Sequence, residues 1–237
     1  MSDVHGNLNA LNAVLAYVEK EYDIRACMLL GDLIDYGMHS NEVLEKLSGL
    51  SVPVLCNIRG NHEQAIINEV YERFSSIRGK ECAKHTREML NENSWNYLES
   101  CMSKEAKCDF NFAGKRCLAV HGCLADENWK SLKMEQELEE YSGYDWVFSG
   151  HSHVPHYGEK YYASEDAVRR NKKKTIFVNP GSVGQPRNLN CLAQFAIVDF
   201  ETERVFLEKV EYDIEQEQSA FDDTVDIFYK ERLTYGV

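Results

Sequence analysis

The chain has 237 residues, of which 43% are hydrophobic and 27% are charged, an ordinary composition for a globular domain with a sizeable core. Its formal net charge of -13 argues against a protein that holds nucleic acid through an extended basic surface. No apolar run approaches the roughly 20 residues of a membrane span, and no basic start precedes an apolar stretch. We therefore expect a cytoplasmic protein whose partner is neither a membrane nor nucleic acid.

Eight cysteines are scattered along the chain without a Cys-x-x-Cys pair. This spacing is typical of buried thiols in a reducing compartment rather than of a disulfide framework or a thiolate zinc site. One basic run, residues 169–174, interrupts the acidic composition. We interpret it as a solvated hairpin tip rather than a phosphate-binding arm.

The first hundred residues alternate helical patterns with short apolar runs. Apolar residues spaced at i, i+3, i+4 and i+7 predict an amphipathic helix at the start. The predicted elements are a helix over 7–20, a strand over 27–30, a helix over 41–50 capped by Ser40, and a strand over 53–58. Residues 63–102 are then predicted to be helical, most clearly at 80–90 and at 94–102 with Ser94 as N-cap. This order indicates a mostly parallel sheet with helices outside.

The second half is dominated by strand patterns. Its predicted elements are a hairpin over 108–112 and 116–121, a charged helix over 131–141, strands over 146–148, 154–162, 175–178, 192–199 and 205–212, and a closing helix over 214–233. We expect an α/β fold in which two mixed sheets lie between helix layers, a four-layer αββα sandwich. It forms a single domain over 1–237, and the helical insertion at 63–102 lies beside the site as a cap.

An acidic pair follows the strand predicted over 27–30. Gly31 ends that strand, and Asp32 and Asp35 come directly after it. Ligands of open α/β sheets bind at the carboxyl ends of strands, and a carboxylate placed there can bridge two cations. Polar clusters with glycine recur at residues 2–7, 59–63, 121–122 and 149–153, mostly at predicted strand ends.

These loops carry the oxygen and imidazole groups that bind water-activating divalent ions. The candidate ligands are Asp3, His5, Asp32, Asn61, His121, His151 and His153. In an extended segment residues i and i+2 point the same way, so Asp3 and His5 could bind one ion. His151 and His153 could likewise share an ion, or bind one each if the loop turns. The role of His156, three residues further on, stays open.

As a set, these motifs resemble the calcineurin-like metallophosphoesterase superfamily. The matching residues are Asp3-x-His5, Gly31-Asp32-x-x-Asp35, Gly60-Asn61-His62-Glu63, His121 and Gly150-His151-x-His153. Residues 2–7 and 179–187 are similar to the small bacterial and archaeal phosphodiesterase branch of that superfamily. The resemblance covers nearly the whole chain.

The resemblance implies a binuclear centre with Asp32 as the bridging ligand. One ion would be held by Asp3, His5, Asp32 and His153, and the other by Asp32, Asn61, His121 and His151. It also implies in-line attack on phosphorus by a hydroxide between the ions, with His62 protonating the leaving oxygen and Asp35 orienting His62. The mixed ligands admit manganese, iron, zinc, cobalt or nickel. Two divalent ions outweigh the charges of Asp3, Asp32 and the hydroxide, and the net positive charge that is left at the centre would attract a small anionic phosphoester.

The chain departs from the resemblance at two places. In the Ser/Thr protein phosphatase relatives an arginine that clamps the substrate phosphate follows the second Asp, and Tyr36 stands there instead. We expect Asn7, Tyr36 and Arg187 to contact substrate, with Arg59 or the helical insertion as other sources of a phosphate donor.

The second departure is at the start of the chain, where only two residues precede Asp3. We therefore expect this end to fray, Asp3 to bind metal less firmly, and upstream residues to be missing from the sequence.

The leading interpretation is a binuclear phosphoesterase that favours phosphodiesters or nucleotide-derived esters over monoesters, because Tyr36 replaces the clamping arginine. A phosphomonoesterase, including a Ser/Thr phosphoprotein phosphatase, is the alternative among enzymes. A non-catalytic scaffold that keeps the fold for binding partners, similar to the retromer subunit, is the alternative from another class. The presence of every predicted ligand together with His62 favours an enzyme.

Overall fold

The computed structural model describes residues 1–168, 170 and 172–237. The basic run predicted to be a hairpin tip thus lies partly outside the described residues, at 169 and 171. One sheet has five strands, in the order β3 (Lys107–Phe112), β4 (Lys115–Val120), β5 (Trp146–Ser149), β7 (Lys174–Asn179) and β6 (His156–Tyr161). The three central strands are parallel and the two edge strands are antiparallel to them.

The second layer contains a parallel and an antiparallel pair of strands. The pairs are β1 (Cys27–Leu29) with β2 (Val54–Asn57), and β8 (Ala193–Asp199) with β9 (Arg204–Val210). Residues 1–3 lie between the pairs, because Asp3 N–H donates to Gly31 O and Val183 N–H donates to Ser2 O. Asp3 is fully buried in this position, so the expected fraying is wrong.

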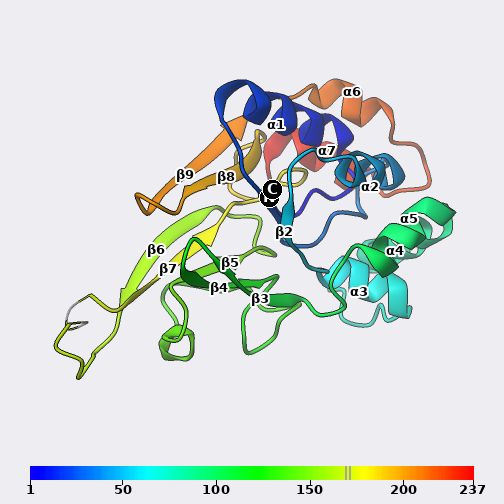
Figure 1. The fold of residues 1–237 in the computed structure, drawn as a ribbon. Helices are drawn as coiled ribbons and strands as arrows, with labels where there is room; N and C mark the ends of the chain where they lie inside the picture. The colour runs from blue at the N-terminus through cyan, green and yellow to red at the C-terminus, as the bar shows by residue number, and fades with distance from the viewer. Residues whose placement is uncertain (169, 171) are drawn as a thin grey trace.

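Helices flank this second layer. They are α1 (Leu8–Glu21), α2 (Ser40–Ser48), α3 (Asn61–Asn68), α4 (Ile77–Met89), α5 (Glu92–Ser100), α6 (Ile214–Ser219) and α7 (Ile227–Tyr235). In Figure 1, α3, α4 and α5 gather on one side of the molecule, and they make up the helical segment predicted at 63–102. Two helix starts differ from the prediction: the N-caps are His39 and Asn91 rather than Ser40 and Ser94.

One core lies between the two sheets, and a larger one packs side chains of α1 to α5 against β1 and β8. Leu30 and Ile58 from one layer pack with Trp146 and Phe148 from the other. Alternate residues of the five-stranded sheet, such as Val147, face the opposite side, as the two-residue period of a strand requires. Fully burying each large apolar side chain contributes about 1.5–3 kcal/mol. The predicted mixed α/β class is confirmed.

The predicted helix over 131–141 is wrong. This segment is irregular except for one 3-10 turn, η1 (Glu139–Tyr141). Leu132, Leu138 and Tyr141 bury their side chains against the outer face of the five-stranded sheet. Because Leu132 and Leu138 are six residues apart, they do not form a helical stripe, and the chain spans the sheet in a more extended form.

The single closing helix predicted over 214–233 is also wrong. Residues 220–226 separate α6 from α7, and Phe221 and Val225 within that break are buried. The Asp222 and Asp226 side chains accept backbone N–H groups two residues further on. Such local bonds offer the backbone an alternative to the helix and begin a new one at α7.

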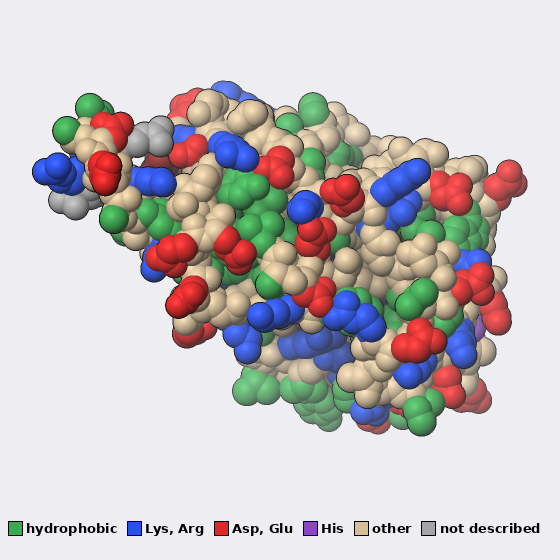
Figure 2. Space-filling view, turned by 90° about the horizontal axis from the view of Figure 1, so that it is seen from below, with side chains coloured by type: hydrophobic (Ala, Val, Ile, Leu, Met, Phe, Trp, Pro, Cys, Tyr) green, Lys and Arg blue, Asp and Glu red, His purple; other side chains and the backbone are tan. Residues whose placement is uncertain are grey.

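Among the helices of the described residues, none is long and apolar enough to cross a membrane. Figure 2 shows one face of the molecule, on which Asp and Glu side chains are interspersed with Lys and Arg side chains.

Candidate metal centre

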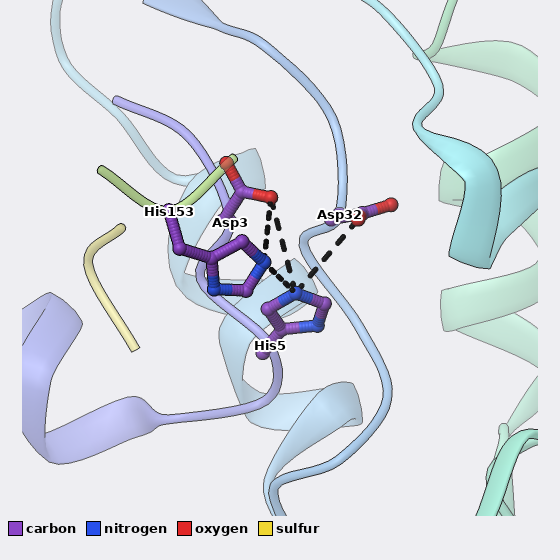
Figure 3. Close-up of side chains that lie close together, drawn as sticks. All are labelled: Asp3, His5, Asp32 and His153. Atoms are coloured by element: carbon purple, nitrogen blue, oxygen red, sulfur yellow. Dashed lines mark hydrogen bonds and ion pairs between the residues drawn. The ribbon is translucent and has the colours of Figure 1, made fainter. Parts of the chain in front are cut away.

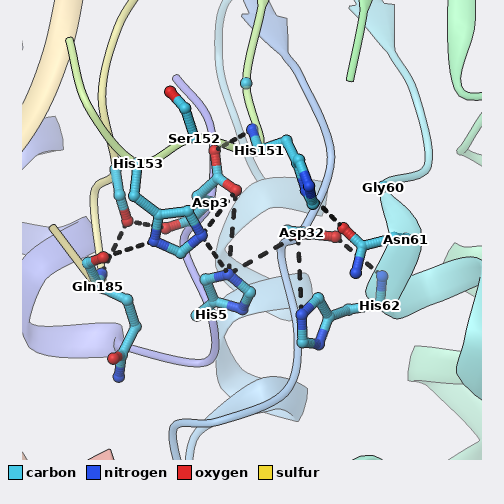
Figure 4. Close-up of polar contacts among 12 residues, drawn as sticks. Asp3, His5, Asp32, Gly60, Asn61, His62, His151, Ser152, His153 and Gln185 are labelled. Carbon is cyan, nitrogen blue, oxygen red and sulfur yellow. Dashed lines mark hydrogen bonds and ion pairs between the residues drawn. The ribbon is translucent and has the colours of Figure 1, made fainter. Parts of the chain in front are cut away.

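Every predicted ligand lies in a loop or at the first turn of a helix. The loops are residues 1–7 before α1, 30–36 after β1, 58–60 between β2 and α3, 121–123 after β4, and 150–155 after β5, and Asn61 is the first residue of α3. The carboxyl ends of parallel strands meet at one edge, so segments far apart in the sequence converge there. Figure 4 shows six of these side chains pointing toward one another, those of Asp3, His5, Asp32, Asn61, His151 and His153.

The first group of side chains is Asp3, His5, Asp32 and His153, drawn in Figure 3. Nε2 of His153 lies 3.2 Å from Oδ1 of Asp3 and 3.2 Å from Nε2 of His5. Nε2 of His5 lies 3.8 Å from Oδ2 of Asp32. With metal–ligand bonds of about 2.0–2.2 Å, ligand atoms of one ion are about 3–3.6 Å apart, so this group is the right size for one ion.

The second group is Asp32, Asn61, His121 and His151. Nε2 of His121 lies 3.1 Å from Oδ2 of Asp32. Oδ1 of Asn61 lies 3.1 Å from that nitrogen and 2.9 Å from Nδ1 of His151. Asp32 therefore belongs to both groups, whereas His151 and His153 belong to different ones. Of the two arrangements left open for these histidines, the geometry favours one ion for each.

Backbone carbonyl groups fix the ring orientation of three imidazoles. A neutral imidazole that donates from Nδ1 keeps a lone pair at Nε2, and such outer partners orient metal-binding histidines. The Nδ1 contacts are His5 to Ile34 O at 3.2 Å, His121 to Leu30 O at 2.7 Å, and His153 to Gln185 O at 2.5 Å. Each of these rings thus directs Nε2 into the centre.

Two buried oxygen atoms lack the partner that a cation would supply. Oδ1 of Asp3 is buried and accepts no hydrogen bond from the described residues. Oδ1 of Asn61 faces only acceptor atoms, and only a rotated amide would turn its nitrogen toward them. Lone pairs of carboxylate, amide and imidazole groups converge here, and this donor set suits divalent transition metals. The residues therefore fit the ions that the resemblance implies.

Electrostatics divides the imidazoles into two kinds. Burial lowers the pKa of His5 well below its usual value and that of His151 to about 4, which leaves both rings neutral near pH 7. Burial acts in the same direction on His121, but the Asp32 carboxylate outweighs it and raises the pKa of His121 to about 9. The Asp32 carboxylate thus favours the protonated form of the His121 ring.

The backbone of the centre is strained. Non-glycine residues in the left-handed region cost about 1–3 kcal/mol each and cluster at functional sites. The residues here with φ between +48° and +73° are Asp3, His5, Asp32, Asp35, Tyr36, His151 and His153. Cross-loop bonds such as His5 N–H to Asp32 O at 3.0 Å hold this conformation.

Glu63 fixes the Asp32 loop, a role that the sequence analysis missed. Its fully buried carboxylate accepts N–H groups from Asp32 at 2.9 Å, Leu33 at 2.7 Å, Ile34 at 3.2 Å and Gly60 at 2.8 Å. Burial and the nearby Asp32 charge raise the pKa of Glu63. The signal that could have found this role is the three-residue spacing from Gly60, which is that of a capping box.

His62 lies at the boundary of the two groups. Its Nδ1 is 2.6 Å from Oδ2 of Asp35, and its Nε2 is 3.9 Å from Oδ2 of Asp32. Thr86 of α4, which was not predicted, donates to Oδ1 of Asp35 at 2.9 Å. Burial alone would lower the pKa of His62, but Asp32 and Asp35 outweigh it and raise that pKa. His62 therefore keeps its proton to a higher pH than a free imidazole does, and its Nε2 faces Asp32.

Two residues considered for substrate contact have structural roles instead. Oδ1 of Asn7 accepts Ala10 N–H as the cap of α1, and its Nδ2 donates to Gly184 O. Both ends of the Asn7 side chain are thus bonded within the protein, which argues against the predicted contact with substrate. Arg59 is buried and donates to Leu98 O at 2.6 Å, which ties β2 to α5.

Tyr36 and Arg187 remain beside the centre. The Tyr36 ring centroid is 4.6 Å from that of His5 and 4.5 Å from that of His62. Arg187 is half-buried, and its backbone N–H donates to His153 O. His156 begins β6, and burial lowers its pKa.

Solved structures resemble this fold over its full length. A metallophosphoesterase from Sphaerobacter thermophilus is 26% identical, with a TM-score of 0.74 over 100% of this chain and 98% of that one. A hypothetical protein, PH1004, from Pyrococcus horikoshii is 21% identical, with a TM-score of 0.84 over 100% and 97%. The latter likeness concerns the fold alone.

Sequence comparison gives the same result. The uncharacterized protein MJ0912 of Methanocaldococcus jannaschii is 28% identical over 220 residues, which are 91% of this chain and 88% of that protein. The family model of the calcineurin-like phosphoesterase superfamily domain matches residues 1–203. Members of that superfamily are metal-dependent hydrolases, and the clustered potential ligands described above agree with this. The chain therefore belongs to the calcineurin-like phosphoesterase superfamily.

Proposed function

We propose that this protein hydrolyses phosphodiesters or nucleotide-derived phosphate esters with the help of two divalent metal ions. The observation that carries the proposal is the position of Asp32, whose Oδ2 lies 3.8 Å from Nε2 of His5 and 3.1 Å from Nε2 of His121. When bound, the ions supply Lewis acidity to the phosphoryl oxygens and lower the pKa of a coordinated water.

The residues divide between binding metal and moving a proton. Asp3, His5, Asp32 and His153 hold one ion, and Asp32, Asn61, His121 and His151 hold the other. His62 donates a proton from Nε2 to the leaving oxygen, and Asp35 keeps the ring oriented through Nδ1, 2.6 Å away. General acids of this kind contribute about 10²–10⁴-fold to a rate.

The preference for diesters follows from Tyr36. A monoester dianion gains more than a diester monoanion from a bidentate guanidinium, and the loop after β1 presents a phenol there. We also propose a cytoplasmic location, based on the scattered cysteines and the acidic composition.

A substrate panel with metal analysis tests the proposal. Metal-depleted protein is reloaded with Mn²⁺, Fe²⁺, Zn²⁺, Co²⁺ or Ni²⁺ and assayed with bis-p-nitrophenyl phosphate, p-nitrophenyl phosphate and diadenosine tetraphosphate. We expect turnover to appear as about two ions bind per chain, with the diester cleaved faster than the monoester. Faster monoester cleavage would favour a phosphomonoesterase or phosphoprotein phosphatase. No turnover with two ions bound would favour a binding scaffold.

A further inference from the structure

Trp129 lies at the solvent-facing edge of the metal centre. Every candidate ligand is buried except His151, whose side chain is partly exposed. Oδ1 of Asn61 lies 2.9 Å from Nδ1 of His151 and 3.3 Å from the backbone oxygen of Asn128. Asn128 and Trp129 are themselves partly exposed. The segment that leads to Trp129 therefore borders the centre next to the ligand that solvent reaches.

The loop that carries His121 also carries Trp129. It turns back on itself through a hydrogen bond from Gly122 N–H to Glu127 O at 2.7 Å. A Cβ atom at Gly122 would lie 2.6 Å from Asp126 O, so another residue would force this turn open. Oδ1 of Asp126 accepts Trp129 N–H at 3.0 Å. The position of the Trp129 backbone is thus tied to that of a metal ligand.

Phe74 connects the Trp129 indole to His62. The Phe74 side chain is 6% exposed and belongs to the segment between α3 and α4. Its ring centroid lies 5.0 Å from that of His62 and 5.2 Å from that of Trp129, with interplanar angles of 71° and 87°. In Figure 4, His62 and Asn61 lie on the side of the centre opposite His153. A continuous series of rings thus runs from His62 to the partly exposed indole.

Arg73 helps to fix the orientation of the indole. Its Cζ lies 5.2 Å from the centroid of the Trp129 ring, and its guanidinium pairs with Asp126 at 2.5 Å. Edge-to-face and cation–π contacts each have a preferred geometry, so Phe74 and Arg73 together hold the ring in place. A ring that is already fixed loses little conformational entropy when it binds a ligand. Trp129 is therefore preorganised to bind a planar group beside the centre.

The leaving group is the part of the substrate that reaches this indole. In the proposed function His62 protonates the leaving oxygen, so the departing group lies on the His62 side of the cleaved phosphoryl group. Aromatic side chains bind nucleobases by stacking, and every base offers a face for this contact. An alkyl group has no such face. A nucleoside is thus the alcohol that fits this side of the centre.

We propose that Trp129 stacks on the nucleobase of a nucleoside that is esterified to the cleaved phosphoryl group. The substrate is then a nucleotide ester, and Trp129 selects it over esters of sugars without a base. This inference rests on the proposed function for the position of the leaving group. It assigns a substrate contact to a residue outside the metal ligands and outside the residues that the sequence predicted.

Paired ligands with and without a base provide the first test. We measure by calorimetry the affinity of the metal-loaded protein for adenosine 5′-monophosphate and for ribose 5-phosphate, which lacks the base. In W129A the first affinity should fall about 10- to 100-fold and the second should stay unchanged. W129F, which keeps a flat ring, should lose less. W95A removes a tryptophan that also contacts an arginine, Arg87, and should change neither affinity.

Unchanged binding of adenosine monophosphate in W129A would overturn the proposal, as would equal losses for both ligands. Tryptophan fluorescence gives a second measurement on conservative variants. Of the three tryptophans, Trp146 is fully buried in β5 and Trp95 lies in α5. Adenosine monophosphate should quench the emission of the wild type and of W95F but not that of W129F, because the base stacks on Trp129. Equal quenching in W129F would contradict the proposal.

Turnover separates this inference from the proposed function. The ratio of kcat/KM for the methyl ester of adenosine monophosphate to that for the methyl ester of ribose phosphate should fall about 10- to 100-fold in W129A. Hydrolysis with a ratio independent of Trp129 would sink this inference alone. Trp129-dependent binding of adenosine monophosphate by a protein that cleaves no ester would instead refute the proposed function and leave the nucleotide site standing.

Discussion

The carboxylate of Glu63 accepts the backbone N–H of Asp32 at 2.9 Å and so holds the loop that carries the shared ligand. It also accepts Gly60 N–H at 2.8 Å, which joins the loop after β1 to the loop after β2. A Cβ atom at Gly60 would collide with the Asp32 carboxylate, so the two loops are in direct contact. Glu63 therefore positions a ligand for the ions without belonging to either donor group.

Replacing Glu63 by Gln should destabilise the fold and weaken metal binding. The substitution loses charge-assisted hydrogen bonds to buried N–H groups, so we expect the free energy of unfolding to fall by about 2–4 kcal/mol. Outer partners of metal ligands are worth about 10–100-fold in affinity, and we expect a loss in that range. Urea unfolding and metal titration measure the two effects. Glu69→Gln, at a 63% exposed carboxylate, is the matched control and should change stability by less than about 0.5 kcal/mol.

Replacing His62 by Ala should slow turnover and spare metal content. We expect a loss of about 10²–10⁴-fold in kcat for a nucleotide ester, whose leaving alkoxide needs a proton. The loss should be smaller for a nitrophenyl ester, whose leaving group is stable as an anion. Steady-state kinetics on both esters, with metal analysis of the variant, check this. Equal losses with both leaving groups would exclude the proton-donor role.

Asp35→Asn tests the pair of His62 and Asp35 with a second variant. The Asp35 carboxylate accepts from His62 and from Thr86, so its amide would disturb the orientation of His62 without removing the ring. We expect its rate loss to depend on the leaving group in the same way. A profile unlike that of His62→Ala would show that the two residues act separately.

Divalent ions should stabilise the fold through Asp32. Ligand that binds only the native state adds about 2.7 kcal/mol to the free energy of unfolding at a hundred times its dissociation constant. We therefore expect Mn²⁺ or Zn²⁺ to raise the melting temperature of the wild type after chelator treatment. In Asp32→Asn most of this increase should vanish, because both donor groups lose their common carboxylate. A full increase in that variant would refute the bridging assignment.

The fold could be predicted where local pattern and tertiary environment agree. The apolar run that forms β5 is buried on both faces and precedes Gly150, so its pattern was clear. The segment 131–141 was wrongly predicted to be a helix because its many charged residues are typical of one. Its apolar residues are instead spaced to cover a sheet. In the closing segment, Asp222 and Asp226 bond locally and end the helical pattern that composition suggested.

The identity of the site residues could be predicted from the sequence, but the arrangement of their side chains in space could not. Glycine beside polar residues at strand ends identified the loops, because such loops meet at one edge of the sheet. The left-handed backbone at His151 and His153 is imposed by neighbouring loops, and it separates two side chains that an extended segment would direct together. Thr86 was missed because its contact with Asp35 joins α4 to the loop after β1, two segments that are distant in sequence.

The contact of His39 with Glu217 should make stability depend on pH away from the centre. Nδ1 of His39 lies 2.9 Å from the buried Glu217 carboxylate, and this hydrogen bond raises the pKa of His39 above 6.5. A raised folded-state pKa gives stability that is full below pH 6.5 and is lost as pH rises through the folded pKa. The stability advantage of the wild type over His39→Gln should therefore shrink between about pH 6 and about pH 9. Urea unfolding at both values measures it, with His85→Gln, at a histidine that contacts the Thr224 hydroxyl, as control. An advantage that grows with pH would contradict the assignment, because only a proton bound more tightly in the folded state gives a decline.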